Sequence, residues 1–108
     1  MEKPNLSYIE QLSGGDTEFT SKLIQVIQTE FPEERLRYEQ KMEQQDWQGA
    51  AIEVHKVKHK ISIFGLKEGY ETAQDFETAL REGRIDGRRE FDAILNSLAN
   101  YIDQLLSE

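Results

Sequence analysis

Residues 50–66 read AAIEVHKVKHKISIFGL, and the spacing of apolar side chains in this stretch decides the fold. When each residue is advanced by about 100° around a helix axis, the small and apolar residues gather within about 60° of Val54. They are Trp47, Ala50, Ala51, Val54, Val57, Ile61 and Gly65. The pattern predicts an amphipathic helix that Asp46 caps and that runs to about Phe64. Gly65 within the stripe predicts the close approach of a neighbouring helix.

The same helical period continues upstream of this helix. The turn Ser13-Gly14-Gly15-Asp16 is predicted to end a short helix over residues 7–12, which Asn5 or Ser7 caps, and to let Asp16 cap a long one. Pro32 lies inside the long helix, and because the pattern resumes beyond it, we expect one kinked helix rather than two. The apolar stripe of this helix consists of Phe19, Leu23, Val26, Ile27, Phe31, Leu36, Tyr38 and Met42.

Two further helices are predicted downstream. One starts between residues 66 and 69, ends at Gly83 and carries the stripe Tyr70, Ala73, Phe76 and Leu80. The other opens at Asp86 or Gly87 and carries the stripe Phe91, Ile94, Leu95, Leu98, Ile102 and Leu105. Four long amphipathic helices with short connections predict an all-α fold. We expect residues 1–108 to form one domain, an antiparallel up-and-down four-helix bundle with a short additional N-terminal helix.

Composition narrows the classes of function. The chain has 108 residues, a formal net charge of −8 and no cysteine. The negative charge disfavours nucleic acid and anionic membranes as partners, and the lack of cysteine excludes disulfides and thiol chemistry. No apolar run is long enough to span a membrane, so we expect a cytoplasmic protein. We also expect a monomer, although exposed isoleucines would be compatible with a dimer. The basic run HKVKHK at residues 55–60 stands out in this acidic chain.

His55 is the candidate reactive residue, because the helical period places it about 100° away from the buried stripe. His59 follows one turn later, at about 140°. Lys58 lies at the edge of the stripe, where its stem can rest on the bundle while its ammonium group leans out beside His55. We therefore expect His55 and Lys58, with His59 as an auxiliary, to form the chemical site.

The residues around this site predict a surface for a partner. Ile52 and Ile63 fall on the solvent side of the helix, where the core does not need them, and Ser62 lies near His55. Lys56 and Lys60 are expected on the far side of the same helix. The candidate partner-binding residues are Ile52, Lys56, Ser62, Ile63 and Gly65.

Phosphoryl acceptance is the chemistry that suits an exposed histidine beside a cation. A neutral imidazole is a good nucleophile near neutral pH, and a lysine three residues along the same face can reach phosphoryl oxygens. The chain has neither a phosphate-cradling glycine motif nor a kinase signature, so we do not expect it to use ATP itself. We therefore expect a phosphoryl carrier rather than an enzyme.

The run AAIEVHKVKHKISIFGL resembles the signature of histidine phosphotransfer (HPt) domains. That family has a histidine followed by a hydrophobic residue after two positions, a lysine after three and a glycine after ten. Here these positions are His55, Val57, Lys58 and Gly65. The upstream stretches LSGGDTEFTSKLIQVIQTEF and MEQQDWQGAAIEVH are also similar to the family, so the resemblance covers roughly residues 5–105. His59 departs from the pattern, because the family usually has glycine directly after the lysine.

The resemblance implies a place in a two-component phosphorelay. His55 would accept a phosphoryl group from an aspartyl phosphate on a receiver domain and pass it to the aspartate of another receiver. The partners would be response-regulator receiver domains and a hybrid histidine kinase. The chain itself would need no cofactor, because Mg²⁺ would be held by the receiver. The acidic pocket of the receiver would face the basic run HKVKHK. At the position of the usual glycine, His59 could crowd the partner or contact the phosphoryl group.

Three other interpretations remain open at this stage. His55 and His59 are four residues apart and could chelate one metal ion, although the sequence offers no third ligand. A degenerate HPt-like domain could act as a helical adaptor that binds proteins without carrying phosphate. Acidic residues such as Asp75 and Glu77 could serve acid–base chemistry, but their spacing favours a solvated face. Within the phosphoryl-carrier interpretation, Arg81 or Arg84 could also reach a phosphorylated His55 from the next helix.

Overall fold

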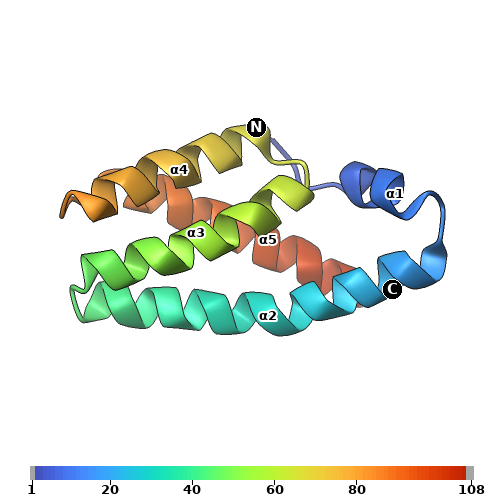
Figure 1. Ribbon diagram of the computed structural model, residues 1–108, viewed down its shortest axis with the longest axis horizontal. Helices are drawn as coiled ribbons and strands as arrows, with labels where there is room; N and C mark the ends of the chain where they lie inside the picture. Colours follow the sequence, from blue (N-terminus) through green and yellow to red (C-terminus); the bar gives the residue numbers. More distant parts are fainter. Residues whose placement is uncertain (1, 107–108) are drawn as a thin grey trace.

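The computed structural model describes residues 2–106, and it contains five helices and no strand within them. They are α1 (Ser7–Ser13), α2 (Thr17–Glu43), α3 (Trp47–Ile63), α4 (Lys67–Arg81) and α5 (Arg88–Leu106). The four long helices alternate in direction along the bundle, and α1 lies at one end beside the start of α2 (Figure 1). The predicted all-α bundle with a short N-terminal helix is confirmed.

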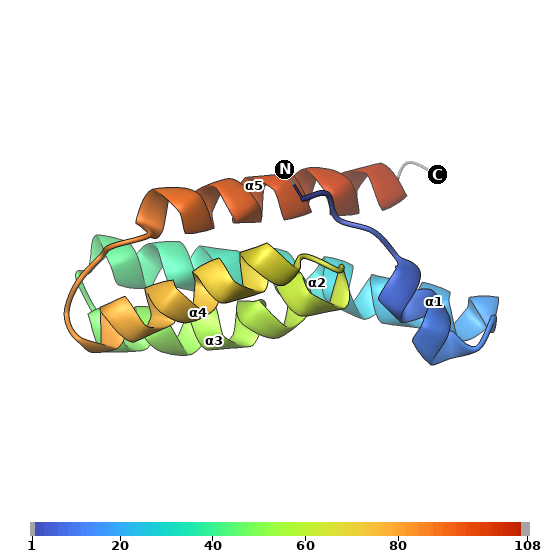
Figure 2. The same cartoon turned by 90° about the horizontal axis from the view of Figure 1, so that it is seen from above.

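The helices α3 and α4 form the most closely packed pair in the bundle. They lie side by side in both views, while α5 lies across from them and packs against α2 and α4 (Figure 2). His55 lies on α3, and α4 is the helix that packs most closely on α3. Side chains of α4 are therefore the ones best placed to act on that histidine.

Side-chain caps fix where α2 and α3 begin, as the sequence predicted. The carboxylate of Asp16 accepts hydrogen bonds from the backbone N–H groups of Glu18 and Phe19, at 3.0 and 3.1 Å. The carboxylate of Asp46 accepts one from the N–H of Gly49 at 2.9 Å. These bonds satisfy N–H groups that have no partner inside the helix. Pro32 lies within a single continuous helix, which confirms that α2 is not split there.

The end of α3 corrects the prediction for Gly65. This glycine lies beyond the helix, with φ of +78°, rather than inside the buried stripe. The N–H of Leu66 donates to the carbonyl of Ile61 at 3.2 Å and the N–H of Gly65 donates to that of Ser62 at 3.0 Å, which is a Schellman ending. Left-handed backbone favours glycine here, and the group close to it is the side chain of Asn5, not a neighbouring helix.

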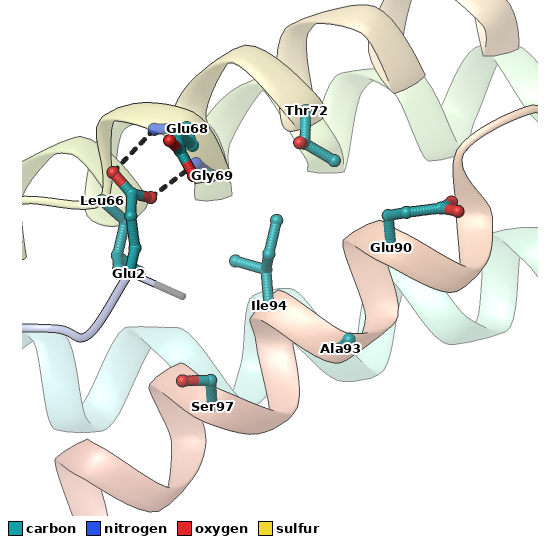
Figure 3. Close-up of a pocket in the computed structure, with 9 residues that line it drawn as sticks. All are labelled: Glu2, Leu66, Glu68, Gly69, Thr72, Glu90, Ala93, Ile94 and Ser97. Atoms are coloured by element: carbon teal, nitrogen blue, oxygen red, sulfur yellow. Dashed lines mark hydrogen bonds between the residues drawn. The ribbon is translucent and has the colours of Figure 1, made fainter.

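The segment before α1 is tied to the corner between α3 and α4. The N–H of Asn5 donates to the carbonyl of Phe64 at 2.9 Å, and the Asn5 side chain accepts from the N–H of Ser7 at 3.0 Å. The carboxylate of Glu2 accepts from the N–H groups of Glu68 and Gly69, at 2.8 and 3.0 Å (Figure 3). Leu66 is the N-cap residue of α4, and its apolar side chain makes no capping hydrogen bond. The carboxylate of Glu2 therefore caps α4 from a distant part of the sequence.

The core is built from one face of each long helix. At its centre the ring of Tyr38 meets those of Phe76 and Phe91 edge-on, with centroids 6.2 and 5.2 Å apart. The predicted stripes of α3, α4 and α5 are confirmed as buried or partly buried. The buried apolar residues of these three helices and their ends are Ala50, Ala51, Val54, Val57, Ile61, Phe64, Leu66, Ala73, Phe76, Ala79, Leu80, Phe91, Leu95, Leu98 and Ile102.

The predicted stripe of α2 is wrong at three positions, because Phe19, Val26 and Leu36 are 45, 50 and 55% exposed. The first turns of α2, where Phe19 lies in the sequence, extend beyond the other long helices (Figure 1). Leu36 lies about 200° around the helix from the buried Tyr38, so the two cannot share one face. The helix α2 has 27 residues and is longer than the helices that pack against it. Those helices cannot bury every apolar side chain along it.

Candidate functional site

His55 projects from the middle of α3 with its side chain 51% exposed. Its Nδ1 atom lies 3.2 and 3.3 Å from the two carboxylate oxygens of Glu77 on α4. An ionised carboxylate can only accept, so in a neutral ring the hydrogen sits on Nδ1 and donates to Glu77. The lone pair is then left on Nε2, on the opposite side of the ring. Glu77 thus fixes both the orientation and the tautomer of His55.

Glu77 is the centre of a charged cluster that the sequence did not predict. Its carboxylate lies 3.1 Å from Nζ of Lys58 and 3.0 Å from Nη2 of Arg81, and its side chain is only 11% exposed. Burial alone would raise the pKa of this carboxyl group. Hydrogen bonds from Arg81, Lys58 and His55 outweigh that effect and lower the pKa below its usual value of 4.5. Glu77 is therefore ionised at neutral pH, which corrects its assignment to a solvated face.

Acid is expected to weaken the bundle through Glu77. Because its pKa is lowered in the folded state, its ionised form stabilises the fold above pH 4.5, and this contribution is lost as the pH falls through the folded-state pKa. We expect the free energy of unfolding, measured by urea denaturation, to fall less steeply below pH 4.5 in Glu77→Gln than in wild type. The exposed Asp75→Asn serves as the control. Equal slopes in wild type and Glu77→Gln would contradict the assignment.

Lys58 does not lie where the sequence predicted. Its side chain is 8% exposed, its ammonium group is paired with Glu77, and Nζ lies 5.4 Å from the ring centroid of Tyr70. The apolar stem follows the bundle as expected, but the charged end turns inward to α4 instead of out beside His55. The reason is the buried carboxylate of Glu77, which the helical period of α3 alone cannot reveal.

The basic run at residues 55–60 is also less exposed than predicted. The side chain of Lys60 is 11% exposed, and its ammonium group lies 2.9 Å from Glu34 and 3.0 Å from Glu30 on α2. Burial opposes its charge, but hydrogen bonds to these two glutamates outweigh burial and raise the pKa of Lys60. Lys56 is about half exposed and lies 3.5 Å from Glu53. Internal carboxylates therefore neutralise much of the run.

The remaining predicted residues fall into two groups. Ile52, His59 and Ser62 are exposed on α3, and Ile52 is 52% exposed. Ile63 is half-buried against the core rather than on the solvent side, and Gly65 is half-buried in the turn after the helix. Phe64 and Leu66, which flank that turn, are buried, and they draw this end of α3 toward the bundle.

The two histidine rings meet edge-to-face. Their centroids are 5.2 Å apart and their planes are at 89°. Within residues 2–106, no three histidine, aspartate or glutamate side chains are grouped so that they could hold a metal ion. Arg81 does reach the neighbourhood of His55, through Glu77, whereas Arg84 pairs with Glu82 and Asp86 in the turn after α4.

One signal in the sequence could have identified Glu77. It lies four residues after Ala73 and three before Leu80, so the helical period places it within the apolar stripe of α4. A carboxylate inside a buried stripe needs a cationic or hydrogen-bonding partner. Arg81, one turn further along, is the nearest such partner in sequence, but His55 and Lys58 are brought to Glu77 only by the packing of α3 on α4.

No helix within the described part of the chain is long and apolar enough to cross a bilayer. A comparison with curated proteins and one with solved structures each returned no match. A comparison with protein-family models matches the Hpt domain over residues 22–108. That match spans most of the chain and includes α3, α4 and α5 with His55 and its neighbours. The chain therefore belongs to the Hpt domain family, whose members are phosphoryl-carrying modules of histidine phosphotransfer in phosphorelays.

Proposed function

We propose that Nε2 of His55 accepts a phosphoryl group from an aspartyl phosphate on a receiver domain and passes it to an aspartate of another. The observation that carries this proposal is the contact of Nδ1 with the carboxylate of Glu77. That contact leaves Nε2 with a lone pair, on a ring that is half exposed. A nucleophile held in one tautomer by a buried carboxylate is prepared for attack in a way that a solvated surface histidine is not.

The transfer balances without further reactants. The lone pair of Nε2 forms the new N–P bond while the P–O bond to the receiver aspartate breaks, and the aspartate leaves as a carboxylate with that electron pair. The hydrogen stays on Nδ1, where the ring gains positive charge beside the negative carboxylate of Glu77. The reverse sequence of bond changes delivers the phosphoryl group to the second receiver.

The partner receiver domain is expected to supply the metal ion and the acidic residues that the transfer needs. In this proposal the receiver holds Mg²⁺ and the acidic residues around the reacting aspartate, and a hybrid histidine kinase supplies the phosphoryl group upstream. The exposed side chains nearest His55 on α3 are Lys56, His59 and, one turn before it, Ile52. We propose that Ile52 packs against the receiver, because a large apolar side chain exposed on α3 beside the nucleophile suits a docking contact.

Transfer from receiver domains tests this proposal. A panel of receiver domains, each phosphorylated with acetyl phosphate and Mg²⁺, is mixed with the protein, and the acid-labile phosphoryl group on His55 is followed over time. We expect at least one receiver to transfer. For that receiver, Ile52→Glu should lower the rate about tenfold relative to the rate with phosphoramidate, a small donor that needs no docking.

Leu36→Glu provides the matched control for the docking contact. Leu36 is 55% exposed and Ile52 is 52% exposed, but Leu36 lies on α2. The ratio of the two rates in this variant should match that of wild type. Stable binding of receivers without any transfer would contradict phosphoryl carriage and would favour the adaptor interpretation.

A further inference from the structure

The lysines of the basic run on α3, and Arg81 on α4, are already engaged with carboxylates in the unphosphorylated protein. Lys58 and Arg81 both bind Glu77, at 3.1 and 3.0 Å. Lys56 lies beside Glu53, and Lys60 is held between Glu30 and Glu34 on the side of α3 that packs on α2. A phosphoryl group on His55 would therefore meet lysines and arginines that already have partners.

Lys58 has the most buried side chain of these cations. Its side chain is 8% exposed, and its ammonium group is enclosed by the carboxylate of Glu77 and the face of the Tyr70 ring. If Lys58 turned outward, Glu77 would lose one of its two cationic partners while remaining nearly buried, which is unfavourable for a carboxylate. In this chain Lys58 is placed to hold Glu77, and Glu77 in turn holds Nδ1 of His55.

His59 is placed differently. It is exposed one turn after His55 on the same side of α3, and the two rings meet edge-to-face with centroids 5.2 Å apart. Among the described residues, no carboxylate is paired with His59, so its ring N–H is available as a donor. With its ring centroid 5.2 Å from that of His55, the imidazole of His59 is close enough for its N–H to reach an oxygen of a phosphoryl group on Nε2.

We propose that His59, rather than Lys58, donates the hydrogen bond to the phosphoryl oxygens on His55, while Lys58 acts as a positioning residue through Glu77. This inference rests on the proposed function and assigns a role to the residue that replaces the usual glycine. A hydrogen bond to a charged phosphoryl oxygen stabilises the phosphorylated state. Phosphohistidine in this protein is therefore expected to persist longer than it would without the His59 donor.

The test uses phosphoramidate, so it does not depend on any partner. Nε2 attacks phosphorus, the P–N bond of phosphoramidate breaks, and ammonia leaves with the electron pair. After removal of the donor, hydrolysis of phosphohistidine is followed by ³¹P NMR. In His59→Phe, which keeps a ring but removes the N–H, we expect hydrolysis about three to ten times faster than in wild type. His59→Gln restores a donor and should recover most of the lifetime.

Lys58→Gln separates the roles of the two residues. Its amide can still donate to Glu77, but it lacks the charge with which Lys58 would stabilise phosphoryl oxygens. Because the inference assigns that contact to His59, which is intact in this variant, its phosphohistidine should outlive that of His59→Phe. A wild-type lifetime in His59→Phe, or a shorter lifetime in Lys58→Gln than in His59→Phe, would overturn the inference and leave the proposed function standing. Absence of phosphohistidine in the wild-type protein would overturn both. Circular dichroism verifies that each variant is folded.

Discussion

His55→Gln is expected to abolish phosphoryl acceptance from phosphoramidate altogether. Glutamine has nearly the same reach as histidine and can still donate a hydrogen bond to Glu77, but its amide nitrogen has no available lone pair for attack. Acid-labile phosphate on the protein, measured by mass spectrometry under neutral conditions, should fall to the level of a blank. Because His55 is half exposed and glutamine can keep the contact with Glu77, the fold and its thermal stability should remain close to those of wild type.

His59→Gln is the matched control for this experiment. It removes the other imidazole of the chain from the next turn of α3, yet it leaves the contact between His55 and Glu77 in place. This variant should still accept a phosphoryl group. Label that persisted in His55→Gln and disappeared in His59→Gln would show that the acceptor had been assigned to the wrong histidine.

Phe76→Ala is expected to be the most destabilising single substitution considered for this bundle. Phe76 is fully buried, and its ring lies 6.2 Å from that of Tyr38 on α2 and 5.2 Å from that of Phe91 on α5. Removing it leaves a cavity where three helices meet, and such a change typically costs about 3–5 kcal/mol. The free energy of unfolding from urea denaturation should fall by this amount, which is a large share of the stability of a small domain.

Leu36→Ala is the control for Phe76→Ala. Leu36 is apolar and helical but 55% exposed on α2, so its truncation should change the free energy of unfolding by no more than about 0.5 kcal/mol. A loss at Leu36 comparable to that at Phe76 would mean that α2 faces the core differently from the structure described above.

The fold was largely predictable because each helix carries its own local signals. Asp16 and Asp46 act as the predicted caps, and the spacing of apolar residues in α3, α4 and α5 places most of them in the core. These features depend on residues within about one turn of each other, which sequence spacing describes well. On α2 the error at Phe19 arises where a long helix extends beyond its partners, which spacing cannot show, whereas the error at Leu36 follows from its angle on the helix.

The site was predictable only in part, because its decisive contacts join different helices. The exposure of His55 follows from its angle on α3, but the burial of Lys58 follows from Glu77, 19 residues further along the chain. Lys60 was misplaced for the same reason, since its partners Glu30 and Glu34 belong to α2. A long charged side chain takes the direction of its partner, and the helical angle of its backbone does not fix that direction.

The central claim is that His55 carries the phosphoryl group on Nε2 while Glu77 holds Nδ1. Protein labelled with ¹⁵N and phosphorylated with phosphoramidate tests it most directly, because NMR detects the coupling between phosphorus and the nitrogen bonded to it. We predict this coupling at Nε2 of His55, with the hydrogen remaining on Nδ1. Coupling at Nδ1 of His55, coupling at His59, or no phosphorus bonded to either ring would contradict the claim.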